Sequence, residues 1–290
     1  MLVQNNKTPL LVDKFVDKLR VMQKTSDEVD RKKARILVTG GAGFIGSNFI
    51  HHVLETRSQV SIINLDKLTY AGNLRNLEGL EAKFDGRYSF YKGCISDTSL
   101  VQKLMKNVNG VIHFAAESHV DRSILDATAF VETNVKGTLN LLNVAVSLGG
   151  VRFVHVSTDE VYGQLTEQDP PFTEDTPIAP NSPYSASKAA SDLLVRAFFH
   201  THKLDTVTTR CSNNYGPYHY PEKLIPLVIT KAKKGEALPI YGKGENVRDW
   251  LFVEDHAKAL VTVVTKGKTF ETYNIGGESE RKNIDVVRSI

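Results

Sequence analysis

The stretch RILVTGGAGFIGSNFI (residues 35–50) joins a short apolar run to a helical pattern through three glycines, Gly40, Gly43 and Gly46. Glycine lets the backbone turn tightly and approach a pyrophosphate closely, and the following helix offers free N–H groups and the positive end of its dipole. The stretch therefore predicts a strand, a phosphate-binding loop and a helix, which together open a dinucleotide-binding fold. The alternative interpretation is a plain strand–turn–helix unit.

A carboxylate follows at the spacing that such a fold requires. Asp66 ends a second apolar run, Val60–Asp66, and lies about 20 residues after Gly46. A carboxylate there can accept hydrogen bonds from the adenosine ribose hydroxyls, and it would repel a 2′-phosphate. The sequence thus predicts NAD rather than NADP as cofactor, although the neighbouring Lys67 weakens that preference.

Strand-like and helix-like segments alternate from residue 35 to about residue 212. The expected strands are 35–39, 60–66, 88–95, 111–115, 151–157 and 206–210. The expected helices are 45–55, 99–107, 129–148 and 185–202. This alternation predicts a parallel sheet covered on both faces, and right-handed crossovers make it a doubly wound, Rossmann-like α/β fold.

The rhythm changes after residue 212. Loops rich in Pro, Gly and Asn separate the later segments, which are expected strands at 238–241 and 272–275 and expected helices at 224–234 and 254–265. We interpret residues 35–212 as the NAD-binding domain and residues 213–290 as a smaller C-terminal lobe on one edge of the sheet. A cleft between two such lobes is a common place for a ligand.

The bulk composition argues against several classes of function. The chain has 290 residues, a formal charge of +3 and two cysteines, Cys94 and Cys211. No basic run interleaved with aromatic residues indicates nucleic-acid binding, no apolar run approaches the roughly 18 residues of a membrane span, and the cysteines match no metal-ligand spacing. We therefore expect a reduced, cytoplasmic protein without a nucleic-acid partner, a membrane span or a metal site.

Residues 1–34 differ from the rest of the chain. Leu11, Phe15, Leu19 and Met22 recur at helical spacing among charged residues, and a charged stretch follows over residues 24–33. The pattern predicts an N-terminal extension made of a surface or partner-contacting helix and a charged linker. A helix lying on a membrane surface is the alternative, and the mixed acids argue against a transit peptide.

Tyr184 and Lys188 lie four residues apart at the start of a helical pattern, so their side chains share one face. A lysine ammonium near a phenol favours the phenolate, which can act as a base near neutral pH. The spacing alone is weak evidence, because Tyr88 and Lys92 repeat it within an expected strand, where residues four apart are separated by about 13 Å. Small residues around Tyr184 leave room for a cofactor.

Two neighbouring carboxylates, Asp159 and Glu160, follow the apolar run 151–156. Ligands bind at the carboxyl ends of strands in this type of fold, so the pair indicates acid–base chemistry. A helix N-cap with an acid in the first turn is the alternative. Neighbouring side chains in a regular strand point to opposite faces, so both acids reach one ligand only if the chain turns at Thr158 or Asp159.

Further motifs occur in order along the chain. They read TGGAGFIGS (39–47), DKLTYAGN (66–73), HFAAESHVDRSI (113–124), STDEVYG (157–163), YSASKAASD (184–192), NNYGPYHYPEKLIPL (213–227), YGKGENVRDWLFVEDHA (241–257) and YNIGG (273–277). Together they resemble the dTDP-glucose 4,6-dehydratase family of extended short-chain dehydrogenases/reductases. The resemblance runs from about residue 35 to residue 290.

The resemblance implies a redox-neutral reaction in which bound NAD takes a hydride from C4 of the sugar, water leaves across C5–C6, and the hydride returns to C6. Tyr184 would remove the C4 hydroxyl proton, with Lys188 lowering its pKa and holding the nicotinamide ribose. Glu160 would take the C5 proton, Asp159 would protonate the departing C6 hydroxyl, and Thr158 would hydrogen-bond the C4 oxygen. Two close carboxylates in a dry pocket push their pKa values apart, as this division of roles requires.

The resemblance also implies a set of binding residues. The NAD contacts would be Gly40, Gly43, Phe44, Ile45, Gly46, Asp66, Lys67, Leu68, Thr69, Cys94, Ile95, Ala115, Ala116, Thr133, Tyr184, Lys188 and Asn214. The substrate contacts would be Ser118, Thr158, Asn213, Glu222, Lys223, Leu224, Arg248 and Asn283. The guanidinium fork of Arg248 suits the diphosphate of a nucleoside-diphosphate sugar, and Lys223 adds a point charge. Cys94 stands where the family usually has an acid that contacts the adenine.

Three hypotheses follow. The first is an enzyme that dehydrates dTDP-glucose to the 4-keto-6-deoxy sugar. The second is a 4-epimerase-like enzyme, which would need Tyr184 and Lys188 but no carboxylate pair after Thr158. The third is a truncated, non-catalytic NAD-binding partner protein, because the family continues beyond residue 290 with a segment that grips the nucleotide, so that 213–290 would be a partial substrate-binding lobe. The family is usually homodimeric, and the expected helices 129–148 and 185–202 could form that contact.

Overall fold

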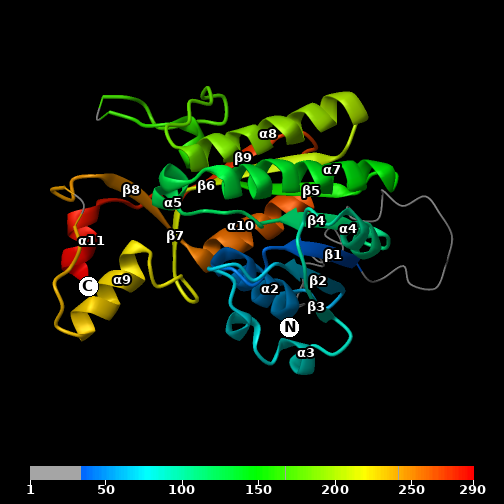
Figure 1. Cartoon of the computed structure of the whole chain (residues 1–290), viewed down its shortest axis with the longest axis horizontal. Coiled ribbons are helices and arrows are strands. Elements are labelled where there is room, and N and C mark those ends of the chain that lie inside the picture. The colour runs from blue at the N-terminus through cyan, green and yellow to red at the C-terminus, as the bar shows by residue number, and fades with distance from the viewer. Residues whose placement is uncertain (1–33, 167, 241) are drawn as a thin grey trace, which may run out of the picture.

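The computed structural model describes residues 34–166, 168–240 and 242–290. The helix and linker expected before residue 34 lie outside the described residues. Figure 1 shows a central sheet with helices on both faces and a smaller lobe at one end. Within the ranges just given, no helix is both long and apolar enough to cross a membrane.

The central sheet has seven parallel strands in the order β3-β2-β1-β4-β5-β6-β9. The strands are β1 (Ala34–Thr39), β2 (Val60–Asp66), β3 (Tyr88–Lys92), β4 (Gly110–His113), β5 (Arg152–Thr158), β6 (Thr206–Cys211) and β9 (Thr272–Ile275). The chain moves outward from β1 in one direction through β2 and β3, and in the other through β4, β5 and β6. The doubly wound, Rossmann-like sheet is thus confirmed, and ligands bind such sheets where the order reverses.

Five long helices flank the sheet: α2 (Phe44–Thr56), α4 (Thr98–Met105), α7 (Thr138–Ser147), α8 (Pro183–His202) and α10 (Val253–Lys266). They cover both faces because successive strand residues point to opposite sides. Ile36 and Val38 pack into a core with α2 and α10. Leu37, between them, packs into a second core with α4, α7 and α8. The unbroken apolar run Ile36, Leu37 and Val38 in the middle of β1 is what a strand buried on both faces requires.

The start of α8 is specified by its sequence. The Ser182 hydroxyl accepts a hydrogen bond from the Ser185 amide at 3.1 Å, and the Ser185 hydroxyl accepts one from the Ser182 amide at 3.0 Å. Pro183 occupies the first helical position, where its missing N–H costs nothing. This reciprocal cap fixes the first turn of α8 and so fixes Tyr184, the second residue of the helix.

The helix expected over 129–148 is a continuous run of three parts. α6 (Thr128–Phe130) passes into a π-helical segment (Val131–Gly137) and then into α7. The wider segment directs Asn134 toward α8, where its amide donates to the Ser187 hydroxyl at 2.9 Å. A π-helical insertion of this kind often lies next to a functional site.

A smaller lobe is built from the C-terminal part of the chain. Its elements are β7 (Asn213–Tyr215), α9 (Leu224–Lys233), β8 (Val247–Phe252), β10 (Glu280–Lys282) and α11 (Asn283–Ser289). β8 pairs in parallel with β7 and antiparallel with β10. Two elements after residue 212, β9 and α10, join the central sheet and its helix layer instead. The domain division at residue 212 therefore stays a prediction.

Several short elements differ from expectation. Residues 238–240 form no strand, and β3 ends at Lys92, before the expected end at residue 95. Elements not expected from the sequence are β7, β8, β10, α3 (Leu80–Lys83), α5 (Val120–Leu125) and 3₁₀ turns at Leu74–Leu77 and Asp159–Tyr162. These elements are short, and most are polar on one side, so neither period is visible in their sequences.

Gly46→Ala is expected to destabilise the protein by about 1–3 kcal/mol, because an added Cβ would clash with the backbone of Gly40 and Gly41, which cannot rotate away. Gly43→Ala is the matched control: its φ is −76°, and the only atom near its added Cβ is the Gly40 oxygen at 3.3 Å. That substitution is expected to cost less than about 1 kcal/mol. Denaturant unfolding without added cofactor measures both, and equal losses would contradict the packing argument.

Candidate active site

A cleft of about 310 Å³ opens where the carboxyl ends of the central strands face the small lobe. Gly40 leaves β1 with φ +73°, a conformation that glycine adopts without strain. Gly43 then starts α2 with no side-chain cap, and the first turn of α2 carries no acid. The free N–H groups at this helix terminus thus face the cleft, as the pyrophosphate of a dinucleotide requires.

Asp66 lies next to the glycine loop and completes the expected binding site for the dinucleotide. Its carboxylate accepts a hydrogen bond from the Ala42 amide at 2.9 Å and from the Leu68 amide at 2.7 Å. Leu68 adopts φ 56°, so a strained residue is kept in place by this contact. Burial raises the pKa of Asp66, while the two amides favour the ionised form. The carboxylate joins the glycine loop to the end of β2 and retains lone pairs for ribose hydroxyls, so the residues fit NAD.

The turn required by the carboxylate pair is present. Thr158 ends β5 in an extended conformation, and the 3₁₀ turn Asp159–Tyr162 begins at the next residue. The Thr158 hydroxyl accepts from the Glu160 amide at 3.2 Å and donates to the Asp159 carboxylate at 3.2 Å. The two acids therefore leave the strand together instead of pointing to opposite faces.

The two acids sit in different surroundings. Glu160 is an exposed residue that lines the cleft, whereas Asp159 is half-buried and lies outside the lining. Burial and the Glu160 charge raise the pKa of Asp159 to about 6. Dense protein around Glu160 also raises its pKa, but the charges of Lys223 and Arg248 oppose that shift. Of the two carboxyl groups, that of Asp159 therefore keeps its proton up to a pH closer to neutrality.

Tyr184 and Lys188 lie beside this turn, and both are buried. Burial and the charge of Glu160 raise the pKa of Tyr184 well above its usual value, while a hydrogen bond with Thr158 opposes the shift. The Lys188 ammonium donates to the Val156 carbonyl oxygen at 2.9 Å. The pKa of Tyr184 is therefore raised, which is opposite to the direction expected from its lysine neighbour alone.

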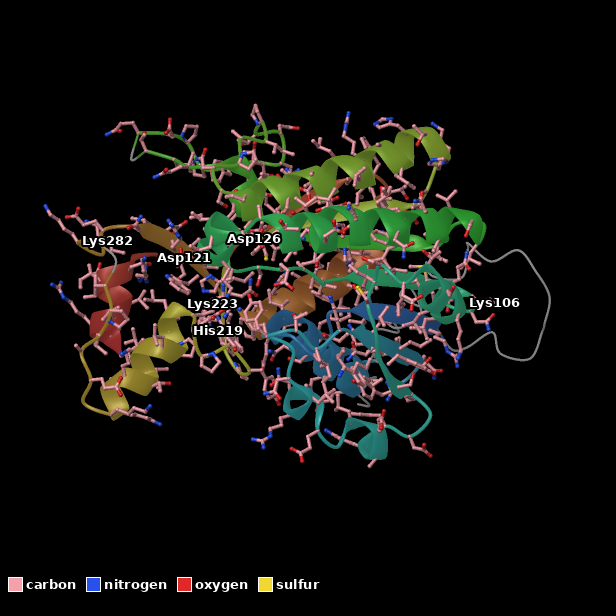
Figure 2. The ribbon with its side chains drawn as sticks, viewed as in Figure 1. Lys106, Asp121, Asp126, His219, Lys223 and Lys282 are labelled. Atoms are coloured by element: carbon pink, nitrogen blue, oxygen red, sulfur yellow. The ribbon has the colours of Figure 1, made fainter. Side chains whose placement is uncertain are left out.

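The small lobe supplies the opposite wall of the cleft. The Lys223 ammonium contacts the Ser118 carbonyl oxygen at 3.4 Å, and burial lowers the pKa of Lys223. Figure 2 places Lys223 and His219 at the junction between α9 and the central sheet. Glu222 points to α5, where it pairs with Arg122 at 3.0 Å. The segment around Lys223 thus links the lobe to the sheet across the cleft.

The structure brings most of the expected site residues into one cleft. Those that line it are Gly40, Gly43, Phe44, Ile45, Gly46, Asp66, Lys67, Thr69, Cys94, Ile95, Ala115, Ala116, Ser118, Thr133, Thr158, Glu160, Tyr184, Lys188, Asn213, Asn214, Glu222 and Lys223. Those outside its lining are Leu68, Asp159, Leu224, Arg248 and Asn283. Arg248 is exposed on β8, and its guanidinium donates to the Val247 carbonyl oxygen at 2.8 Å. Leu68 serves the site through its backbone amide.

Some lining residues had been given no role from the sequence. They are Tyr70, Glu117, Ser157, Cys211, Ser212, His219 and Tyr220. Cys211 ends β6, so its place at a strand terminus was the signal that could have marked it. His219 stacks on Phe44 with ring centres 4.3 Å apart, a contact between lobes that no local pattern reveals.

Comparisons with known proteins place this geometry in a family. The family model described as GDP-mannose 4,6 dehydratase matches residues 37–290. A dTDP-glucose 4,6-dehydratase of Xanthomonas campestris pv. campestris (strain B100) is 59% identical over 266 residues, which cover 88% of this chain and 74% of that protein.

Solved structures agree with the sequence comparison. The dTDP-glucose 4,6-dehydratase DesIV of Streptomyces venezuelae, crystallised with NAD bound, has a TM-score of 0.84 at 49% identity, covering 88% of this chain and 79% of that one. The UDP-glucose 4-epimerase of Thermus thermophilus, in complex with NAD, has a TM-score of 0.79 at 28% identity, covering 88% and 81%.

The Rossmann-like sheet, the glycine loop and the Tyr184–Lys188 pair define an extended short-chain dehydrogenase/reductase. Within that class the chain belongs to the dTDP-glucose 4,6-dehydratase family, part of the wider GDP-mannose 4,6-dehydratase family. It spans about three quarters of the length of the curated relatives named above, 74% in the Xanthomonas case.

Proposed function

We propose that the protein is a hydro-lyase that converts dTDP-glucose to dTDP-4-keto-6-deoxyglucose and water with NAD as cofactor. The observation that carries this proposal is the turn at Thr158, which brings Asp159 and Glu160 off the end of β5 beside Tyr184. An epimerase-like oxidation needs a base at Tyr184 only, and it leaves two buried or cleft-facing carboxylates without a role. Dehydration needs one acid and one base more, so it is favoured over the epimerase-like and the non-catalytic alternatives.

The proton transfers divide among the side chains of the turn and of α8. NAD, when bound, supplies the hydride acceptor for C4 and the hydride donor for C6. Tyr184 takes the proton of the C4 hydroxyl, and the Lys188 ammonium stabilises the phenolate. Glu160, open to the cleft, takes the C5 proton, and Asp159, whose pKa is raised to about 6, gives a proton to the departing C6 hydroxyl. Thr158 hydrogen-bonds the C4 oxygen and stays attached to both acidic residues.

The small lobe supports a nucleoside-diphosphate sugar as the substrate. Lys223 is a half-buried cation whose ammonium has only a carbonyl oxygen at 3.4 Å as hydrogen-bond acceptor within the described residues. Burial lowers the pKa of Lys223, so an anionic ligand would restore the solvation that the ammonium has lost. Arg248 lies close enough to act on the pKa values of Asp159 and Glu160, so its fork can turn toward a diphosphate near the same turn.

The oligomeric state and the cellular location are inferred from other features of the structure. We infer a homodimer formed through the π-helical segment, α7 and α8, which lie side by side on one face of the sheet (Figure 1). Their outer surface carries Leu193, 55% exposed, and Val131, 44% exposed. A cytoplasmic location is supported by the two cysteines, Cys94 and Cys211, which are free thiols.

Glu160→Gln is expected to stop formation of the 4-keto-6-deoxy product, because an amide cannot take the C5 proton, while oxidation at C4 continues and NADH accumulates on the enzyme. The loss of dehydration should be at least about a hundredfold, the usual contribution of a positioned base. Mass spectrometry of the sugar nucleotide and NADH absorbance measure the two steps. Dehydration by Glu160→Gln at the wild-type rate would refute the role of Glu160, and a wild type that makes no keto sugar would refute the proposed function.

The pH dependence of kcat/KM is expected to report Asp159. This parameter reflects groups of the free enzyme, and Asp159 must hold a proton to act as the acid. Its pKa, raised to about 6, predicts that kcat/KM falls about tenfold per pH unit above that value. On the acid side, activity falls when Glu160 gains a proton. A kcat/KM for dTDP-glucose that stays constant from about pH 6 to 8 would contradict the role of Asp159.

Leu193→Arg is expected to convert the homodimer into a monomer, because a charged side chain would be buried at the centre of the helix contact. Leu74→Arg is the matched control, since Leu74 is 46% exposed on a 3₁₀ turn away from these helices. Size-exclusion chromatography with light scattering measures both masses. A wild-type monomer, or a Leu193→Arg dimer, would contradict the proposed assembly.

A further inference from the structure

A buried ion pair lies one helical turn beyond Lys188. Asp192 of α8 is 4% exposed and Arg210 of β6 is 7% exposed. The Arg210 guanidinium donates through Nε to the Asp192 carboxylate at 2.9 Å, and its central carbon lies 4.7 Å from the centre of the Tyr162 ring. Replacing a buried ion pair by apolar groups is often neutral or stabilising. Stability alone therefore does not account for two charges at this place.

Lys188 is the group that needs a charge of opposite sign. It lies four residues before Asp192, so the two side chains share one face of α8. Its ammonium is buried, and its one hydrogen-bond partner within the described residues is the neutral carbonyl oxygen of Val156 at 2.9 Å. Burial lowers the pKa of Lys188, and the charge of Asp192 is the largest influence against that shift. A buried ammonium without a counter-charge would release its proton.

The other titratable groups around Lys188 carry no negative charge near neutral pH. Burial, with Lys188, lowers the pKa of His155 on β5 to about 4, and burial lowers that of His113 on β4, so both rings are neutral. Burial raises the pKa of Cys211 on β6 to about 12 and raises that of Tyr184 on α8. The carboxyl groups of the turn after β5 act on the pKa of Tyr184, whereas Asp192 is the carboxylate that acts on the pKa of Lys188.

Arg210 keeps Asp192 ionised. Burial opposes the charge on Asp192, but the contact with His155 and the charge of Arg210 outweigh it, so the pKa of Asp192 is lowered. The His155 ring nitrogen lies 3.2 Å from the carboxylate oxygen that Arg210 does not contact. Because His155 is neutral, Arg210 supplies the charge of this arrangement and His155 supplies orientation.

We propose that Asp192 and Arg210 are positioning residues of the active site: Asp192 keeps Lys188 protonated beside Tyr184, and Arg210 holds Asp192 ionised and in place. The inference rests on the proposed function only in that Lys188 acts there on Tyr184. The two charges act on Lys188 with opposite sign. Asp192→Asn makes the surroundings of Lys188 more positive and favours loss of its proton. Arg210→Met removes a positive charge, and the Asp192 carboxyl group stays ionised in the alkaline range where a lysine titrates, so the surroundings of Lys188 become more negative and favour retention of its proton.

The direct measurement does not depend on activity. In protein labelled with ¹³C at lysine Cε, an NMR titration follows Lys188, whose signal is assigned by its loss in Lys188→Arg. Asp192→Asn is expected to lower the titration midpoint of Lys188 by about one pH unit, and Arg210→Met is expected to raise it. Asp192→Glu keeps the charge and should restore the wild-type midpoint. Midpoints that agree within error in all these variants would overturn the proposal.

The kinetic measurement uses the Glu160→Gln background, in which C4 oxidation is followed by NADH absorbance without interference from the acid step at Asp159. The alkaline limb of the oxidation rate, where Lys188 loses its proton, is expected to move to lower pH with Asp192→Asn and to higher pH with Arg210→Met. A merely structural role would lower the rate at every pH without moving the limb, and that result would refute the inference. Absence of keto product from the otherwise wild-type enzyme would refute the proposed function, and the NMR titration would still decide the role of the ion pair.

Two further variants separate charge from folding. Asp192→Asn combined with Arg210→Met removes both members of the ion pair, so neither is left as an unpaired buried charge, and the double variant is expected to fold even if a single variant does not. Its midpoint should move in the direction of Asp192→Asn, because Asp192 has the stronger effect on Lys188. Asp205→Asn breaks the other pair on these strands, in which Arg152 contacts Asp205 at 2.8 Å at the opposite end of β5. It should lower stability and leave the Lys188 titration in place; a comparable shift there would count against a specific role for Asp192.

Discussion

The structure depends on one constraint. Because both faces of the parallel sheet are buried, polar side chains that act on a ligand can lie only at the ends of its strands. The residues of β1 alternate between two apolar cores, so no polar ligand can be held along the strand itself. At the carboxyl ends the chain must turn, and there the polar residues collect. The glycine loop follows β1, Asp66 ends β2, and Thr158 ends β5. The cofactor cradle and the acid–base groups are neighbours because parallel strands end at one edge.

Loss of contact with water at that edge of the sheet shifts the pKa values of the acid–base side chains. Burial raises the pKa of Asp159 and lowers that of Lys188, so it works against both charges at once. At Glu160 the charges of Lys223 and Arg248 oppose the effect of burial on the pKa. Two adjacent carboxyl groups therefore hold their protons with different strength, and an acid and a base arise from a single turn of the chain. The Asp192–Arg210 pair applies the same principle to Lys188.

The sequence predicts the features that depend on local chemistry and period. The doubly wound sheet, α2 with its glycines, and the Tyr184–Lys188 face all follow from residue spacing, and most expected site residues line one cleft. Features that arise from tertiary contacts could not be predicted from the sequence. The raised pKa of Tyr184 results from burial and from Glu160, which no spacing rule includes. Residues 238–240 read as a strand, yet within the described residues no strand pairs with them. The place of β9 in the main sheet depends on pairing with β6, from which it is separated along the chain by β7, α9, β8 and α10.

The small lobe is attached to the cofactor side of the molecule as well as to the substrate side. His219 stacks on Phe44 at the first turn of α2, and the Asn48 amide of the same helix donates to the Pro217 carbonyl oxygen at 2.9 Å. Tyr220 meets Tyr70, beyond the end of β2, edge to face. An enzyme that exchanged its nicotinamide in every turnover would have to break these contacts each time. A dehydration that returns its hydride to the sugar regenerates the cofactor in place, so these contacts can persist through turnover.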